Sequence, residues 1–186
     1  MDEHTLVRQA ANGDVAAWES LMVLHQEAVF RLAYLLLGDP DDAQDVAQEA
    51  FLRAWRHLLT FDATRPLRPW LLSISANLAR NRRRSAGRYI AALMRAFRDE
   101  PPVERIEDQS VRSLQAGELW KAVQNLNLMD QQIVYLRYFL ELPVAETSQI
   151  LQIPEGTVKS RLSRALEKLR EIIQHDFPVL FEGREI

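Results

Sequence analysis

The sequence predicts an all-α protein made of two small helical domains that a flexible linker joins. Apolar residues recur at three- and four-residue steps along nearly the whole chain, as in amphipathic helices, and no segment shows the period-two alternation of a strand. Helix-start and helix-break signals divide the chain into separate segments. The 186 residues include no cysteine, which excludes disulfides, thiolate metal sites and thiol catalysis.

Three helices are expected in the first half of the chain. An apolar stripe over residues 18–36 predicts the first. Asp39 suits an N-cap and Pro40 the first helical position, so a second helix is expected to begin there. A loop over residues 60–66 separates it from a third helix near residues 67–84. The inward face of the second helix would hold Ala43, Val46, Ala47, Ala50, Phe51, Ala54, Trp55 and Leu58.

The second half of the chain predicts a helix-turn-helix. A two-turn helix over residues 144–151, a three-residue turn and a longer helix from residue 155 have the spacing of that motif, which places its second helix in the DNA major groove. Before it, residues 88–98 could form a short amphipathic helix, and an acidic stretch covers residues 99–109. We therefore expect domains at 1–88 and 114–175, a linker at 89–113 and a tail at 176–186.

Charge is unevenly distributed, although the whole chain carries a net charge of only −3. Residues 61–98 contain nine arginines and one acid, a net charge of +8, and residues 158–172 carry a net charge of +3. One such block alone is typical of a solvated helix face. Two blocks on separate helical units favour binding to a nucleic acid.

Other function classes find less support in the residues. The acidic N-terminus lacks an apolar signal core, and the longest apolar run has six residues where a membrane span needs about 20, so a cytoplasmic protein without membrane insertion is expected. A magnesium site at Asp41, Asp42, Asp45 and Glu49 is a minor alternative, because no phosphate-binding glycine loop accompanies it. Catalytic residues, metals and cofactors are not expected.

Two segments resemble one known family. Residues 156–165, Gly-Thr-Val-Lys-Ser-Arg-Leu-Ser-Arg-Ala, resemble region 4 of the extracytoplasmic-function sigma factors of the sigma-70 family. Residues 42–55, together with Phe61 and the Trp70 to Asn77 stretch, are similar to region 2 of the same family. The output domain of response regulators also carries a Thr-Val-Lys step, but the Arg-Leu-Ser-Arg-Ala continuation favours the sigma family.

The resemblance implies roles for individual residues. A sigma factor would direct core RNA polymerase to promoters, contacting the β′ clamp coiled coil and the β flap, under control of an anti-sigma factor. The residues of this chain that dock on the clamp would be Asp45, Gln48, Glu49 and Leu52. The −10 element would be bound and melted, and the loop at 61–66 would capture a flipped base. The residues that contact this element would be Phe61, Asp62, Arg65, Asn77, Arg80 and Arg84. The −35 element would be read by Glu155, Thr157, Lys159, Ser160, Arg161 and Arg164.

Some residues depart from the family pattern. Pro154 stands where a capping serine is usual, and Gln152 replaces a turn glycine, which predicts a positive φ at a non-glycine residue. Asn127, Ala145 and Thr147 are further replacements. Trp70 is expected in the core rather than on a stacking surface. Two other functions remain open at this point, an autonomous helix-turn-helix regulator and a metal-dependent phosphotransfer enzyme.

Overall fold

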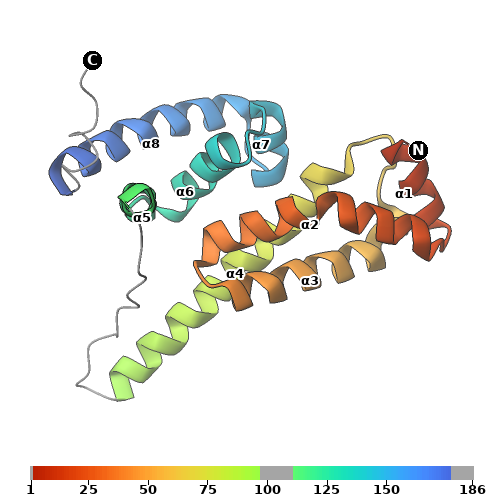
Figure 1. Cartoon of the computed structure of the whole chain (residues 1–186), viewed down its shortest axis with the longest axis horizontal. Helices are drawn as coiled ribbons and strands as arrows, with labels where there is room; N and C mark the ends of the chain where they lie inside the picture. Colours follow the sequence, from red (N-terminus) through yellow and green to blue (C-terminus); the bar gives the residue numbers. More distant parts are fainter. Residues whose placement is uncertain (1, 97–110, 177–186) are drawn as a thin grey trace.

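The computed structural model describes residues 2–96 and 111–176, with side chains for 2–85 and 117–176. Every regular element within these ranges is helical, as the sequence predicts. The predicted acidic linker segment and the tail from residue 177 lie outside the described residues. Figure 1 shows two groups of helices, one formed by the N-terminal half of the chain and one by the C-terminal half.

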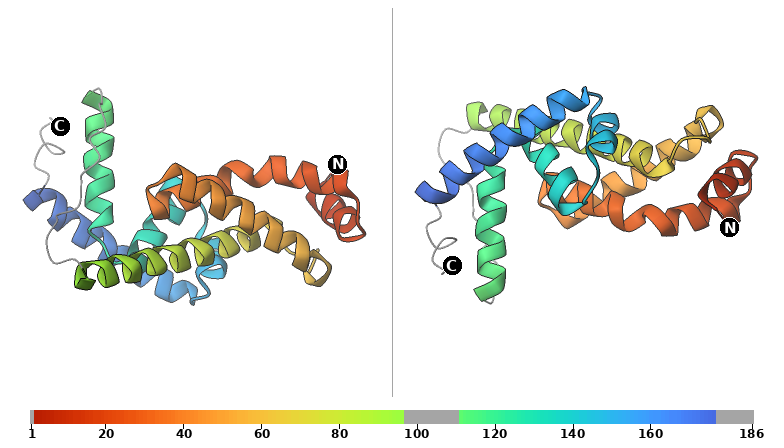
Figure 2. Two further views of the ribbon diagram at one scale, coloured as in Figure 1. Left: turned by 90° about the horizontal axis from the view of Figure 1, so that it is seen from below. Right: turned by 90° about the horizontal axis from the view of Figure 1, so that it is seen from above.

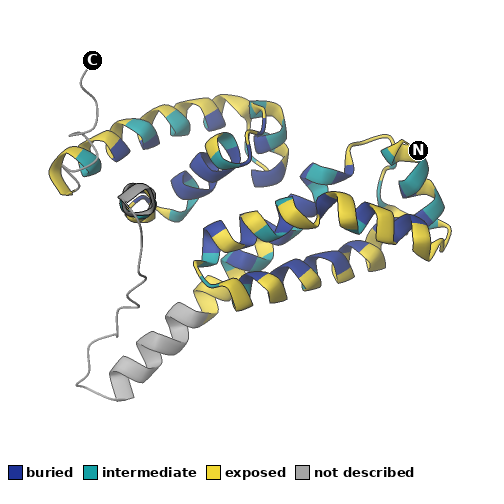
Figure 3. Ribbon diagram, in the orientation of Figure 1, coloured by how far each residue is buried: buried dark blue, intermediate teal, exposed yellow. Residues whose placement is uncertain are grey.

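The first group consists of three long helices and one short one. Helices α2 (Val15–Leu37), α3 (Pro40–His57) and α4 (Leu67–Ala96) pack against one another, and α1 (Glu3–Ala11) packs at one end of α2 (Figure 1). A 3-10 turn, η1 (Leu58–Thr60), follows α3. Figure 3 shows that the buried residues of α2 and α3 face each other across this domain.

Capping residues set the helix boundaries where the sequence predicts them. Asp39 Oδ1 accepts a hydrogen bond from the Asp42 N–H at 2.9 Å, with Pro40 as the first residue of α3. Gly38 ends α2 with a φ of 75°, a left-handed conformation that favours glycine.

Helix α4, in contrast, continues to Ala96 rather than ending near residue 84. No proline interrupts residues 70–96, so the separate short helix expected over residues 88–98 merges with α4 up to residue 96.

Helix α2 is the central element of this domain. By length and composition alone it is the one helix in the described ranges that could cross a membrane. Nine of its residues are buried, and α1, α3 and α4 all contact it. Since the core helix of a soluble domain passes the same composition test, this is weak evidence for a span.

The second group contains α5 (Val111–Gln124), α6 (Leu128–Val134), a single π-turn η2 (Tyr135–Phe139), α7 (Val144–Leu151) and α8 (Glu155–Asp176). Asn127 is the N-cap of α6, because its Oδ1 accepts from the Asp130 N–H at 3.1 Å. Gln152 has a φ of 56°, which confirms the strained turn predicted from the missing glycine. Pro154 offers only its carbonyl, which accepts from the Thr157 N–H at 2.9 Å.

The two groups of helices touch each other. Helix α7 packs along α4, and Figure 2 shows the C-terminal group lying across the α4 side of the first domain. Arg83 Nη1 donates to Gln131 Oε1 at 2.9 Å. Trp120 of α5 stacks on Tyr34 of α2 at 6.1 Å and on Tyr135 at 5.6 Å, so aromatic rings continue from one domain to the other.

Candidate nucleic-acid interface

The outer face of α3 presents acidic and polar side chains to solvent. Asp45 and Gln48 are exposed, Glu49 is half-buried, and Leu52 is 51% exposed. Glu49 Oε1 accepts from Arg53 Nε at 2.7 Å, a pair one helical turn apart. These residues share one face, opposite the buried alanines of the same helix.

Helix α4 also contacts this acidic face. Arg82 Nη2 donates to Asp45 Oδ2 at 3.0 Å and to Asp42 Oδ1. The hydrogen bond to Asp42, aided by both carboxylate charges, raises the pKa of the Arg82 guanidinium. A cation therefore already pairs with two carboxylates of the alternative magnesium site. Among the described residues, no group of three or more histidines, aspartates or glutamates could hold a metal ion.

An apolar groove of about 790 Å³ runs beside this face, between α2 and α3. Trp18 packs against Trp55 at 5.3 Å and edge-on against Phe51 at 6.1 Å. Trp55 is 36% exposed, so its predicted burial is wrong: the tilted pairing with Trp18 leaves one side of the ring facing the groove. An open apolar groove of this size suits the apolar face of a partner helix. Its other lining residues include Met22, Phe30 and Leu52.

A second hollow, of about 600 Å³, lies where the loop at 61–66 meets α4. Phe61 stacks on Trp70 with ring centroids 4.5 Å apart, and both rings line the hollow. Trp70 is half-buried: it packs against the core, as expected, and it also lines the hollow. Four of the six predicted −10 residues line this hollow, namely Phe61, Asp62, Arg65 and Asn77.

The remaining two predicted −10 residues continue along α4. Arg80 and Arg84 lie three and seven positions after Asn77, on the same helical face. Arg80 donates to Asn77 Oδ1. Burial and the nearby charge of Arg84 lower the pKa of Arg80, although the group stays cationic. The hollow thus opens onto a row of positive charge.

The carboxylate of Asp62 organises the loop from within. Its Oδ1 accepts from the Thr64 N–H at 3.0 Å and from the Thr64 hydroxyl at 2.6 Å. The hydroxyl bond, followed by the backbone bond, lowers the pKa of Asp62. Gln149 and Gln152 of the second domain also line the hollow, so both domains contribute to it.

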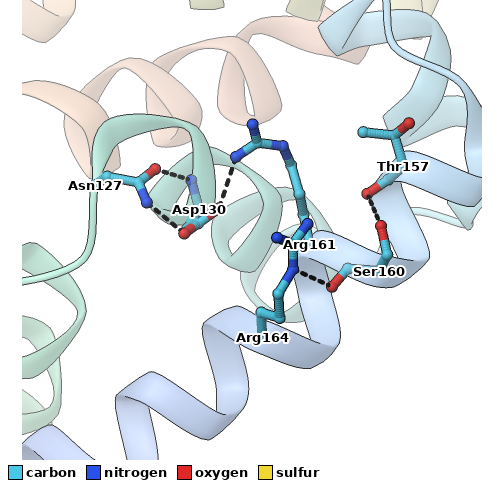
Figure 4. Close-up of polar contacts among 6 residues, drawn as sticks. All are labelled: Asn127, Asp130, Thr157, Ser160, Arg161 and Arg164. Carbon is cyan, nitrogen blue, oxygen red and sulfur yellow. Dashed lines mark hydrogen bonds and ion pairs between the residues drawn. The ribbon is translucent and has the colours of Figure 1, made fainter.

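Helix α8 carries the residues predicted to read the −35 element, and Figure 4 draws four of them, Thr157, Ser160, Arg161 and Arg164. Glu155, Lys159, Ser160 and Arg164 are exposed, and Thr157 is half-buried. Arg164 Nε donates to the Ser160 carbonyl at 3.2 Å, and the Ser160 hydroxyl donates to the Thr157 carbonyl at 3.2 Å. The opposite face of α8 packs into the core through Val158, Ala165 and Leu169.

Arg161 has a partner within its own domain. Its Nη1 lies 3.3 Å from Asp130 Oδ1 of α6, and Asp130 is in turn held by Asn127 (Figure 4). The guanidinium is half-buried, unlike that of Arg164. This contact uses one nitrogen of the five-donor guanidinium group.

Comparison with known proteins identifies the family. The family model of sigma-70 region 2 matches residues 21–89, and that of sigma-70 region 4 matches residues 116–169. The chain belongs to the sigma-70 family. The extracytoplasmic-function RNA polymerase sigma factor SigW of Bacillus subtilis is 32% identical over 174 residues, covering 89% of this chain and 93% of SigW. This sigma factor is therefore a transcription initiation factor of the extracytoplasmic-function class.

Solved structures confirm the fold of this sigma factor. CnrH in complex with the cytosolic domain of CnrY has a TM-score of 0.72 at 24% identity, covering 94% of this chain and 99% of CnrH. The sigma factor RpoE in complex with the anti-sigma factor NepR from Bartonella quintana has a TM-score of 0.68 at 23% identity, covering 87% and 99%. The fold of the sigma factor is thus two helical domains that correspond to regions 2 and 4.

The structure brings the predicted residues together in three places: the α3 face, the hollow with its arginine row, and the polar face of α8. Sequence reasoning missed the groove residues Trp18, Met22 and Phe30, because a helical stripe cannot reveal which apolar side chains remain partly open. It also missed Arg82. The long separation between Asp45 and Arg82 leaves no local pattern that could have paired them.

Proposed function

We propose that this sigma factor binds core RNA polymerase through the α3 face and its groove, melts the −10 element at the hollow and reads the −35 element with α8. The observation that supports this most strongly is the kind of side chain that each of the three surfaces groups together. Each gathers side chains of the type its ligand needs: acidic and apolar for a basic coiled coil, aromatic and cationic for single-stranded DNA, and cationic on a helix for duplex DNA.

Polymerase docking would use both polar and apolar contacts. Asp45 and Glu49 would pair with basic side chains of the β′ clamp coiled coil, while Leu52 and the open edge of Trp55 would fill apolar positions. Large aromatic side chains at such a site carry much of the binding energy. The β flap would be contacted by the second domain.

Promoter melting would depend on base capture at the hollow. Extruding a base from a duplex costs a few kcal/mol, and stacking on an aromatic ring returns about 1–3 kcal/mol per base. The stacked Phe61 and Trp70 rings offer such a surface, and Asn77 offers a hydrogen-bonding amide. Arg80 and Arg84 would follow the phosphates of the single strand away from the hollow.

Reading both promoter elements requires the two domains to separate. The −10 and −35 elements are about 25 base pairs apart, or about 85 Å at 3.4 Å per step of the duplex. In the structure, α7 contacts α4, and Gln149 and Gln152 line the −10 hollow. The described arrangement is therefore a closed form, which must open before the sigma factor can bind both elements.

Regulation by an anti-sigma factor fits this closed form. A similar sigma factor, RpoE of Bartonella quintana, is solved in complex with the anti-sigma factor NepR. We propose that an anti-sigma factor binds this chain too and stabilises the closed form in the cytoplasm. The protein acts as a binding subunit and has no catalytic role of its own.

Binding to core polymerase tests the docking surface. Asp45→Arg combined with Glu49→Arg reverses two charges on α3 and should abolish co-elution with bacterial core polymerase while helicity is retained. Glu167→Arg with Glu171→Arg is a matched control, because these exposed acids have the same four-residue spacing on α8. Unchanged co-elution of the α3 variant would remove the docking assignment.

Run-off transcription on genomic fragments tests the function as a whole. New discrete transcripts that depend on the sigma factor are expected, and their start sites would define both promoter elements. Tight duplex binding by the isolated protein, with no transcripts and no co-elution, would instead favour an autonomous helix-turn-helix regulator.

A further inference from the structure

We propose that helix α1 positions the −10 loop, with Glu3 and His4 as the positioning residues. This inference rests on the proposed function of the loop at 61–66. The region 2 family model begins at residue 21, so both residues lie outside the segment that defines the family. They come from the start of the chain and reach a loop some 60 residues later.

Glu3 fixes the end of the loop where α4 begins. Its Oε1 accepts a hydrogen bond from the Leu67 N–H at 2.9 Å. Leu67 is the first residue of α4, and the first amides of a helix have no partner within the helix itself. Glu3 therefore caps α4 from a distant part of the sequence. Its other oxygen, Oε2, lies 3.1 Å from Nε2 of the buried His25, which places the carboxylate against α2.

His4 fixes the middle of the loop. Its Nδ1 lies 2.7 Å from the carbonyl oxygen of Ala63. Because a carbonyl can only accept, Nδ1 must carry the proton and donate. Ala63 directly follows Asp62, and Asp62 itself stabilises the turn of the loop by accepting hydrogen bonds from Thr64.

The loop is thus held at three points along its length. Phe61 is stacked on Trp70, Ala63 is bound by His4, and Leu67 is bound by Glu3. Two of the three contacts come from α1, which also packs against η1 just before the loop. A loop whose backbone is fixed before DNA arrives loses less conformational entropy on binding, and it presents one shape to the incoming base. Helix α1 therefore sharpens the choice of base at the −10 element.

Base preference of the holoenzyme tests this role, because a general loss of folding would not affect one promoter element alone. Full-length variants are assembled with bacterial core polymerase. Each holoenzyme is mixed with two pools of DNA. The first is forked promoter DNA in which the −10 non-template strand is randomised, and the second is promoter DNA in which the −35 duplex is randomised. Sequencing of the bound fraction gives the enrichment of the favoured base over the least favoured one at each position.

His4→Ala and Glu3→Ala should lower the −10 enrichment ratio roughly two- to tenfold, the change that one hydrogen bond supports, and leave the −35 ratio unchanged. His4→Asn should retain the wild-type ratio, since its amide nitrogen can take the place of Nδ1. Glu3→Gln should also retain it through its carbonyl oxygen. His175→Ala, an exposed histidine at the end of α8, is the matched control.

Asp62→Ala separates this inference from the function it rests on. If Asp62→Ala lowers the −10 ratio but His4→Ala and Glu3→Ala do not, the role of α1 is overturned and base capture by the loop stands. If all three leave the ratio unchanged, base capture at this loop fails and the inference fails with it. An equal drop at both promoter elements would show a general structural effect and would also overturn the inference.

Discussion

Opening of the closed form can be tested at Arg83, whose side chain links the two domains. Arg83 Nη1 donates to Gln131 Oε1 at 2.9 Å, and Gln131 is 1% exposed. A hydrogen bond that involves a charged group contributes about 1.5–3 kcal/mol, and the low end applies because Arg83 itself is exposed. Arg83→Ala should therefore shift the equilibrium between closed and open forms by about 1.5 kcal/mol, or roughly tenfold, towards the open form.

Energy transfer between two dyes measures this equilibrium directly. The chain contains no cysteine, so Glu19→Cys on α2 and Glu167→Cys on α8 give two unique labelling positions, both exposed. High transfer is expected for the free protein, and low transfer once core polymerase and promoter DNA hold the domains about 85 Å apart. In Arg83→Ala, the low-transfer population of the free protein should rise about tenfold relative to the closed one.

Arg84→Ala is the matched control for this experiment. It removes the neighbouring, exposed arginine of the predicted −10 row and should weaken DNA binding without changing the closed population. Equal transfer in the free wild type and in Arg83→Ala would refute the assignment of this contact. Transfer that stays high in the holoenzyme on promoter DNA would refute the need for opening.

Three further substitutions have defined outcomes. Trp55→Ala removes a partly exposed ring from the groove and should weaken core polymerase binding by about 2 kcal/mol, a roughly 30-fold rise in Kd measured by titration. Leu59→Ala is the control and should leave Kd unchanged, because Leu59 is 80% exposed and lies outside the groove. The buried Tyr135 hydroxyl has no hydrogen-bond partner in the described residues, and its burial raises the pKa of Tyr135 to about 12. Tyr135→Phe should therefore leave the free energy of unfolding in urea unchanged or raise it by about 1 kcal/mol. Burial lowers the pKa of His25 below its usual 6.5 despite the opposing charge of Glu3, so the unfolded chain takes up the proton first. The contribution of His25 to the free energy of unfolding should therefore be constant above pH 6.5 and fall as the pH drops below it. His25→Gln should lose this part of the pH dependence in urea titrations.

Local signals in the sequence predicted the helix boundaries well. The Asp39 and Pro40 start of α3 and the positive φ of Gln152 both depend on a few adjacent residues, and both are confirmed. Such features are decided within one turn of the chain, where propensity and capping dominate. The positions of the site residues on exposed helix faces could be predicted for the same reason, since helical spacing fixes which side chains share a face.

Features that depend on tertiary packing could not be predicted in this way. Trp55 has the spacing of a core residue, but its exposure depends on how closely α2 approaches α3, which the stripe does not encode. The pairing of Glu3 with Leu67 joins residues 64 positions apart and leaves no periodic trace in either segment. The end of α4 also differs from the one expected near residue 84, because the arginines at 82–84 are good helix formers and do not stop the helix.

The packing of α4 links the two surfaces that sequence reasoning treated separately. Arg82 pairs with Asp42 and with Asp45 of the proposed docking face, and in sequence it lies between Arg80 and Arg84 of the proposed −10 row. A basic side chain of the polymerase that binds Asp45 must compete with Arg82 for the same carboxylate. Exposed ion pairs of this kind contribute at most about 1 kcal/mol, so a partner with several cations can displace Arg82 at little cost. Displacement frees Arg82 on the side of α4 that faces α3, not on the face shared by Arg80 and Arg84. The proposed polymerase binding at α3 should therefore break the Arg82 contact between α3 and α4 without adding a cation to the proposed −10 row.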